Sequence, residues 1–139
     1  MINRKDKIVE YCREKTVLHH VAIQFSDRNK AEIFFTKLLG LQKVKSFTVS
    51  ENISEEIFGM AKSIDVDVYG DDEARFEVFI TNNKRKPEFE HICIVIDDKS
   101  TFIKRCKKYG IEPVVIKKEG KDLLFVKDFS DNLYEVKER

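Results

Sequence analysis

The sequence contains few cysteines and has no long apolar run. Its three cysteines, Cys12, Cys93 and Cys106, are too few and too scattered for a disulfide framework or a cysteine-based zinc site. A helix that spans a bilayer needs about 20 consecutive apolar residues, and no stretch approaches that length. The first residues lack the apolar segment of a secretory signal. We therefore expect reduced thiols and a cytoplasmic location.

The sequence also lacks an excess of charge of either sign. Lysine and arginine number 26 and aspartate and glutamate 25, so no overall field favours nucleic acid or a membrane as a partner. The basic cluster 84–86 is short and is followed by Glu88 and Glu90, which indicates a solvated loop. With 139 residues, of which 42% are hydrophobic, the chain is long enough for one soluble domain with a real core.

A repeat with an offset of 71 residues runs through the chain. Segment 20–27 (HVAIQFSD) aligns with segment 91–98 (HICIVIDD), and apolar side chains alternate in both. Alternation with a period of two is typical of a β-strand with one buried face. Each strand leads into a segment with helical spacing of apolar residues, ended by Gly40 in the first half and by Gly110 in the second. The sequence therefore predicts a duplicated module.

Three further strands are expected after each helix. They cover 43–49, 64–69 and 74–80 in the first half, and 113–117, 121–126 and 133–137 in the second. We predict an α+β fold in which two tandem βαβββ modules form one curved eight-stranded mixed sheet with a metal or ligand cleft. The modules cover about 18–81 and 88–138 of a domain at 18–139, with 82–87 as the connector. Residues 1–17 are expected to form a helical extension, and 51–61 a short helix.

Four polar residues occupy repeat-related positions. His20 and His91 begin equivalent strands, while Glu77 and Glu135 lie inside equivalent last strands between apolar neighbours. A glutamate that faces a sheet interior carries a desolvation cost unless a cation compensates its charge. Two imidazoles and two carboxylates suit Zn, Ni, Mn, Co or Fe(II). Taken singly, however, such a histidine is commonly a surface residue and such a glutamate commonly faces solvent, so the residues alone leave both interpretations open. By alternation, His19 points away from His20 and receives no role.

Three segments resemble the vicinal oxygen chelate superfamily. Segment 18–41 resembles its opening module, segment 91–97 the first strand of its second module, and FVKDFSDNLYE at 125–135 its closing motif. The superfamily contains glyoxalase I, methylmalonyl-CoA epimerase, extradiol dioxygenases, fosfomycin resistance enzymes and bleomycin-binding proteins. Bacterial-type glyoxalase I has His, Glu, His and Glu as metal ligands, so the resemblance implies one divalent metal ion on His20, Glu77, His91 and Glu135. It also implies a homodimer, with ligands from one chain or from two.

Departures from the glyoxalase I pattern affect the expected substrate. Gln24 replaces an arginine that binds glutathione, Thr81 replaces an asparagine, and Phe129 and Asp131 replace the proline and glycine of the closing motif. These changes argue against glutathione. The candidate substrate-binding residues are Gln24, Cys93 and Arg75. Arg75 shares a strand face with Glu77 and could instead pair with Asp65 or Asp67.

The resemblance implies a metal-dependent lyase or isomerase. Such an enzyme would move a proton between adjacent carbons of a small 2-oxo, hemithioacetal or acyl-thioester substrate, with Glu135 as the base. The alternative is a non-catalytic small-molecule binder of the bleomycin-resistance branch, whose members generally lack the metal residues. A fosfomycin-type transferase is a third possibility, which would need more inward-facing lysine, arginine and serine residues than we find.

Overall fold

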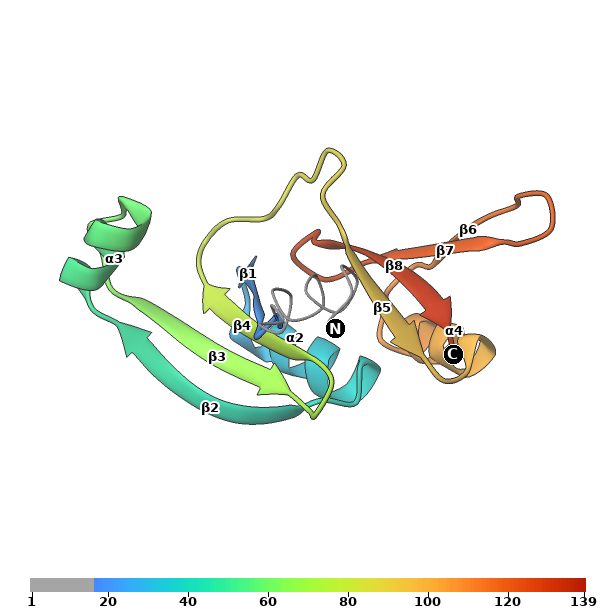
Figure 1. Cartoon of the computed structure of the whole chain (residues 1–139), viewed down its shortest axis with the longest axis horizontal. Coiled ribbons are helices and arrows are strands. Elements are labelled where there is room, and N and C mark those ends of the chain that lie inside the picture. The colour runs from blue at the N-terminus through green and yellow to red at the C-terminus, as the bar shows by residue number, and fades with distance from the viewer. Residues whose placement is uncertain (1–16) are drawn as a thin grey trace, which may run out of the picture.

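The computed structural model describes residues 17–139, which form two βαβββ modules lying side by side (Figure 1). The first module contains β1 (Val21–Phe25), α2 (Arg28–Glu32), η1 (Ile33–Leu38), β2 (Gln42–Val49), α3 (Glu51–Phe58), β3 (Ile64–Gly70) and β4 (Arg75–Ile80). The second contains β5 (Ile92–Ile96), α4 (Lys99–Lys108), β6 (Val114–Ile116), β7 (Leu123–Lys127) and β8 (Leu133–Glu138). The predicted strands and the short helix after Ser50 are confirmed. The predicted N-terminal helix lies outside the described residues, except for Val17.

Each module builds its own four-stranded mixed sheet. The strand orders are β1-β4-β3-β2 and β5-β8-β7-β6, and the first strand of each module pairs in parallel with its last strand. The expectation of one continuous eight-stranded sheet is therefore wrong, since no strand pairing joins the two sheets within residues 17–139. Each module completes its strand pairing internally, and the two modules are joined by the side chains of one shared hydrophobic core.

The helix of each module begins and ends in the same way. Asp27 Oδ1 accepts a hydrogen bond from the backbone N–H of Lys30 at 3.1 Å, and Asp98 Oδ1 accepts one from that of Ser100 at 3.0 Å. These aspartates satisfy backbone donors that a helix leaves unpaired at its start. Gly40 and Gly110 follow the helices with φ values of 71° and 81°, a conformation that favours glycine. The repeat seen in the sequence therefore sets both helix boundaries.

The first helix differs from a regular α-helix in a way that the sequence did not reveal. Its second part, η1, has π-helical bonding, with the Leu39 N–H donating to the Phe34 carbonyl at 3.0 Å. Within it, Thr36 Oγ1 donates to the Glu32 carbonyl at 2.6 Å and so uses an acceptor of the helix backbone. The wider turn still buries the three apolar side chains Phe34, Phe35 and Leu38 completely.

One hydrophobic core joins the helix-covered faces of both sheets. Phe25, Phe76 and Val78 of the first sheet belong to it, as do residues of α4 and of the second sheet, including Phe102, Cys106, Tyr134 and Val136. Helix α4 packs against η1, so that the helices of the two modules meet. Phe34 of η1 also contacts Tyr134 of β8, with ring centroids 5.1 Å apart. The predicted alternation is confirmed, because these core residues occupy every second position of their strands.

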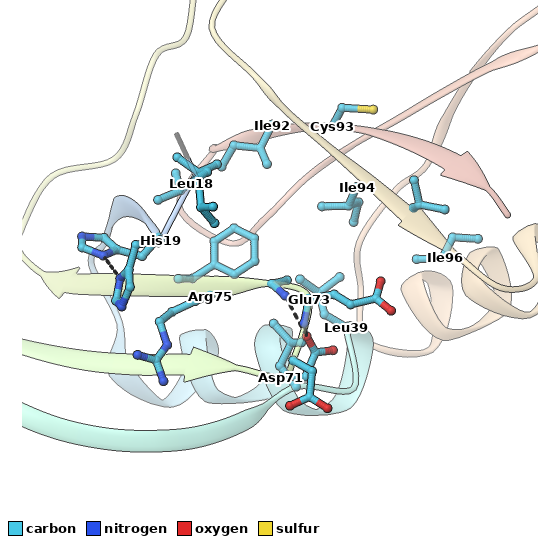
Figure 2. Close-up of a pocket in the computed structure, with 18 of the residues that line it drawn as sticks. Leu18, His19, Leu39, Asp71, Glu73, Arg75, Ile92, Cys93, Ile94 and Ile96 are labelled. Atoms are coloured by element: carbon cyan, nitrogen blue, oxygen red, sulfur yellow. Dashed lines mark hydrogen bonds between the residues drawn. The ribbon is translucent and has the colours of Figure 1, made fainter. Parts of the chain in front are cut away.

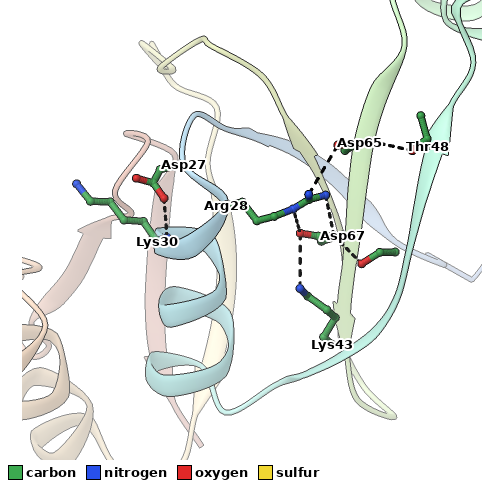
Figure 3. A network of polar contacts seen from close by, with 8 residues as sticks. Asp27, Arg28, Lys30, Lys43, Thr48, Asp65 and Asp67 are labelled. Atoms are coloured by element: carbon green, nitrogen blue, oxygen red, sulfur yellow. Dashed lines mark hydrogen bonds and ion pairs between the residues drawn. The ribbon is translucent and has the colours of Figure 1, made fainter.

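A polar network lies between the start of α2 and the first sheet (Figure 3). Its centre is Asp67, which is 1% exposed and accepts hydrogen bonds from Arg28 Nε at 2.8 Å and Ser46 Oγ at 2.6 Å. Burial alone would raise the pKa of Asp67, but the hydrogen bonds from Ser46 and Arg28, together with the charge of Lys43, lower it below its usual value. Arg28, and not Arg75 as the sequence suggested, is therefore the arginine that pairs with the Asp67 carboxylate.

Strand register explains why Arg75 does not pair with Asp67. In the antiparallel pair β3–β4, Asp67 lies opposite Val78, whereas Val68 lies opposite Glu77. Side chains of directly paired residues share a face, so Asp67 faces the helix with Val78, while Arg75 shares the opposite face with Glu77. Asp65, which also contacts Arg28 at 3.7 Å, lies on the helix side with Asp67. The expected pairing of Arg75 with either aspartate is therefore wrong.

Candidate metal centre

The first module brings His20 and Glu77 together. His20 immediately precedes β1, and Glu77 lies in β4 opposite Ala22 in the parallel register. His20 Nδ1 lies 3.3 Å from Glu77 Oε2, and the two side chains are 35% and 18% exposed. Because the core takes the other face of the sheet, this pair lies on the face away from the helices.

The second module repeats this arrangement with His91 and Glu135. His91 immediately precedes β5, and Glu135 lies in β8 opposite Cys93. His91 Nε2 lies 3.3 Å from Glu135 Oε1, with the side chains 37% and 20% exposed. The sequence repeat therefore becomes a structural repeat of two histidine–carboxylate pairs, each at the parallel junction between the first and last strands of its module.

A hydrogen bond to the second ring nitrogen of His91 determines the tautomer of its ring. His91 Nδ1 lies 2.8 Å from the carbonyl oxygen of Phe89, and because a carbonyl only accepts, Nδ1 carries the proton. In a neutral ring, Nε2 then presents a lone pair to the Glu135 carboxylate, which is also an acceptor. A proton or a cation between the two atoms would make this contact favourable. Metal-bound histidines usually donate their other N–H to a carbonyl or carboxylate in this way, so the donor set fits a metal ion.

Within residues 17–139 the two pairs do not come together. No group of three or more histidine, cysteine, aspartate or glutamate side chains in this part of the chain is arranged to hold a metal ion. Each module thus offers two ligands, whereas sites for zinc and similar ions use at least three protein ligands. The four-residue centre stays a prediction, and a complete centre requires the two pairs to face each other.

The structure places His19 against His20 rather than away from it. Their Nδ1 atoms are 2.8 Å apart and their rings meet edge to face at 5.0 Å between centroids. The expectation of opposite directions is wrong because both residues precede β1, where the chain does not follow strand alternation. One Nδ1 donates to the other, so His19 influences which nitrogen of His20 carries a proton.

The three predicted substrate-binding residues lie in two different cavities. Gln24 lines a pocket of about 300 Å³ next to His91, whereas Arg75 and Cys93 line a larger cavity of about 670 Å³ (Figure 2). Gln24 Oε1 accepts a hydrogen bond from Thr81 Oγ1 at 3.0 Å, so two of the departures from the glyoxalase I pattern contact each other. Arg85 of the connector, which was expected only as part of a solvated loop, lines the pocket beside His91.

The loop before β8 ties the second half-site to the first module. The carboxylate of Asp128, which is 3% exposed, accepts hydrogen bonds from the Tyr134 hydroxyl at 2.7 Å and from the N–H of Ser130 at 2.9 Å. Burial raises the pKa of Asp128 against these hydrogen bonds. Ser130 Oγ in turn accepts from the N–H of Ser26 at 3.0 Å, just after β1. The position of Glu135 is therefore fixed relative to β1 by this loop.

The loop before β8, which belongs to the closing motif, keeps its turn although Asp131 stands at the glycine position of that motif. Asp131 has a φ of 66°, in the left-handed region where the resembling motif has glycine. Aspartate is one of the few other residues that adopts this conformation at low cost. Phe129, in place of the proline, packs against the core, and the Lys30 ammonium lies 5.8 Å from its ring centroid. The altered residues thus keep the turn that precedes Glu135.

Comparison with known proteins identifies the family. A sequence model of the glyoxalase/bleomycin resistance protein/dioxygenase superfamily matches residues 19–126. A search of curated proteins finds no match. Among solved structures, a glyoxalase family protein from Bacillus cereus is similar with a TM-score of 0.69 and 17% identity, over 89% of this chain and 95% of that one.

Other solved structures show the same fold. A glyoxalase family protein from Enterococcus faecalis has a TM-score of 0.65 and 19% identity, over 86% of this chain and 95% of that one. The fosfomycin resistance protein FosX from Listeria monocytogenes has a TM-score of 0.68 and 14% identity, over 88% and 93% of the two chains. A variant of that FosX has been seen with Mn(II) and a dihydroxypropylphosphonic acid. At these identities the likeness establishes the fold and not the reaction. None of the described helices is long and apolar enough to cross a membrane.

Proposed function

The chain belongs to the glyoxalase/bleomycin resistance protein/dioxygenase superfamily, and on this premise we propose that it is a metal-dependent lyase or isomerase. The proposed reaction moves a proton between adjacent carbons of a small 2-oxo, hemithioacetal or acyl-thioester substrate. The observation that carries the proposal is the structural repeat of the His20–Glu77 and His91–Glu135 pairs, each with a nitrogen–oxygen distance of 3.3 Å.

The four side chains of these pairs would hold one divalent cation, of Zn, Ni, Mn, Co or Fe. Imidazole nitrogen and carboxylate oxygen are suitable ligands for all of these ions. When bound, the cation would supply a Lewis acid that stabilises negative charge on two neighbouring substrate oxygens. The carbonyl of Phe89 would keep His91 in the tautomer that presents Nε2.

We propose further that a second copy of the chain completes the centre. His20 and Glu77 of one protomer would face His91 and Glu135 of the other, giving two equivalent centres in a two-fold dimer. The ligand-bearing faces support this, because they carry apolar side chains that the single chain leaves exposed. Examples are Phe47 in β2, 37% exposed, Val95 in β5, 53% exposed, and Val114 in β6, 51% exposed. Register places Phe47 beside Val66 and Val114 beside Phe125, on the faces away from the helices.

Glu135 is the proposed base, by analogy with glyoxalase I. Its carboxylate would take the proton from one substrate carbon and return it to the next carbon. The loop that contains Asp128 holds β8 and so keeps this carboxylate at a fixed position relative to β1. Such positioning of the base contributes to the rate because the reacting atoms are held in place.

We propose that the substrate contains no glutathione moiety. Gln24 is hydrogen-bonded to Thr81 and supplies no positive charge for a glutathione carboxylate. Arg85, which lines the same pocket as Gln24, would instead face an anionic group of a smaller molecule or of an acyl-thioester. The free thiols of Cys93 and Cys106 are compatible with the cytoplasmic location that we also propose.

The test begins with the metal content of the purified full-length protein. We expect about one Mn, Ni, Zn, Co or Fe ion per chain, either retained on purification or bound on titration. The loaded protein is then incubated in D₂O with 2-oxoaldehyde–thiol adducts and acyl-thioesters, and NMR follows exchange of the proton next to the carbonyl. A protein that stays metal-free at all metal concentrations would sink the proposal.

A non-catalytic binding protein is the second candidate. One observation favours it, namely that no three ligands come together within residues 17–139. Such a protein would bind a small molecule at the same site, and its affinity would be equal in the presence and in the absence of metal. It would not catalyse exchange of a substrate proton. Calorimetric titrations of both forms distinguish the two functions.

A further inference from the structure

A row of aromatic side chains lies on the ligand-bearing face of the first sheet. Phe79 follows Glu77 by two positions in β4, so strand alternation places both side chains on this face, about 7 Å apart along the strand. The register pairs Phe79 with Val66 of β3, and Val66 with Phe47 of β2. Because directly paired residues share a face, these three residues form one row across three strands.

Helix α3 adds a further ring to this row. The ring of Phe58, the last residue of α3, meets the Phe79 ring edge to face, with centroids 5.6 Å apart. Ser54 lies one turn earlier on the same face of the helix and is completely buried. The hydroxyl of Ser50 caps the start of α3, and Gly59, with a φ of 69°, ends it. A helix with both ends capped therefore holds Phe58 against the sheet.

The three phenylalanines form an aromatic wall that is partly open to solvent. Phe47 and Phe58 are 37% and 49% exposed, and Phe79 is half-buried, whereas Val66 between the strands is completely buried. Apolar side chains that stay exposed together on one surface are typical of a binding site. Because the wall begins two positions from Glu77, a molecule bound to it would reach the candidate metal centre.

The second module shows that the fold does not require this wall. Lys137 follows Glu135 by two positions in β8, as Phe79 follows Glu77 in β4. The repeated module therefore accepts a lysine at this position. The aromatic wall is a feature of the His20–Glu77 half of the candidate centre.

A positive charge lies beside the wall. Lys45 precedes Phe47 by two positions, and its Nζ lies 5.6 Å from the centroid of the Phe47 ring. In the register of β2, β3 and β4, Lys45 lies opposite Val68, which lies opposite Glu77. The ammonium group favours a ligand that combines an apolar ring with a negative charge.

We propose that the aromatic wall binds the ring of a substrate that carries an aryl group next to two vicinal oxygens, as in an aryl-substituted 2-oxo or 2-hydroxy acid. The ring packs on Phe58 and Phe79 with the edge-to-face or offset geometry that aromatic pairs prefer. The oxygens then reach the His20–Glu77 half of the centre, since about 7 Å along β4 separates it from the ring. This substrate class rests on the proposed function, whereas binding of the ring by the wall requires no metal.

Two stable ligands with the same 2-hydroxy acid group test the wall. Mandelate has a phenyl ring where lactate has a methyl group, and both are titrated by calorimetry into the full-length protein with and without Mn(II). We expect mandelate to bind on the order of 30-fold more tightly than lactate in both states, because only mandelate buries an aromatic ring. A ratio near one, or no binding of mandelate in either state, overturns the inference. If the proposed function alone fails, Mn(II) leaves both affinities unchanged and the preference for mandelate remains.

Variants of α3 assign this preference to the wall. Phe58→Ala should lower the ratio to about threefold, and Phe58→Leu, which keeps an apolar side chain, should give an intermediate ratio. Ile53→Ala is the matched control, since Ile53 is 51% exposed on another face of the same helix, and it should keep the wild-type ratio. Circular dichroism checks that each variant is folded.

Two results with these variants overturn the inference. One is an unchanged ratio in folded Phe58→Ala. The other is dissociation of a wild-type dimer by Phe58→Ala in analytical ultracentrifugation, because the wall would then be an interface between copies of the chain.

Discussion

Asn132 Nδ2 donates a hydrogen bond to the backbone carbonyl of Gln24 at 2.9 Å, across 108 positions of the chain. The same nitrogen lies 2.9 Å from Asp128 Oδ2, so the amide bridges the closing loop of the second module and β1 of the first. Asn132 is 8% exposed, and hydrogen bonds at such buried positions are costly to lose. This bond attaches a side chain of the second module to the backbone of the first. The two modules carry the two halves of the candidate metal centre.

Removing this bridge should loosen the two modules. Asn132→Ala removes the side-chain donor to the Gln24 carbonyl and leaves Asp128 Oδ2 with the Tyr134 hydroxyl alone, and we expect the free energy of unfolding to fall by about 2 kcal/mol. Urea denaturation followed by circular dichroism measures the change. Asn82→Ala, in the exposed connector, is the matched control and should leave stability within about 0.5 kcal/mol of wild type. Equal effects of the two substitutions would contradict the role of Asn132.

The Asp67 network should make stability depend on acid pH. The pKa of Asp67 is lowered in the folded protein, so its contribution is present above the unfolded value of about 4 and is lost as pH falls through the lower folded value. Asp67→Asn should reduce the free energy of unfolding by about 2 kcal/mol at pH 7. The difference from wild type should shrink below pH of about 4.

Denaturation curves at several pH values check the Asp67 prediction. Asp72→Asn, at an exposed turn position, serves as the control with the same chemical change. A wild-type advantage over Asp67→Asn that stays constant from neutral pH down to strongly acid pH would show that the charge of Asp67 is not responsible.

Sharing of the metal centre between two chains predicts complementation. His20→Ala and His91→Ala should each bind no metal tightly, because each loses one ligand from both centres. When the two variants are mixed and allowed to exchange subunits, each heterodimer keeps one intact centre. Random exchange makes half of the dimers heterodimers, so about a quarter of the wild-type metal content should return. Recovery of nothing, with heterodimers shown by native mass spectrometry, would place each centre within one chain.

Loss of the proposed base should separate metal binding from turnover. Glu135→Gln is expected to lower kcat by a factor on the order of 10² to 10⁴ on a substrate identified by the proton-exchange screen, while an amide oxygen still allows weaker metal binding. Glu119→Gln, in the turn between β6 and β7, should keep full turnover. Substrate-proton exchange by NMR and metal analysis are measured on the same samples. Full turnover by Glu135→Gln would show that another group moves the proton.

Local signals in the sequence determined the elements of each module. The 71-residue repeat, the strand alternation, and the Asp…Gly pattern around each helix act through backbone geometry within a few residues, and all of them reappear in the structure. The faces of the strands follow from the same period, which is why the sequence alone places Glu77 and Glu135 on equivalent faces. The apolar spacing did not predict the π-helical turn, whose Phe34 and Phe35 are buried in the core shared by the modules.

Only the tertiary structure decided which residues meet across the modules. Sequence spacing does not reveal that Arg28 rather than Arg75 reaches Asp67, since that depends on the register of β3 against β4. Nor does it reveal that the eight strands divide into two sheets, or that each sheet holds its own histidine–carboxylate pair. Helices that pack together in one core turn the ligand-bearing faces of both sheets away from that core. The sequence by itself therefore identified the four candidate ligands. The packing of the modules, which places the helices in the shared core, decided that these ligands form two separate pairs.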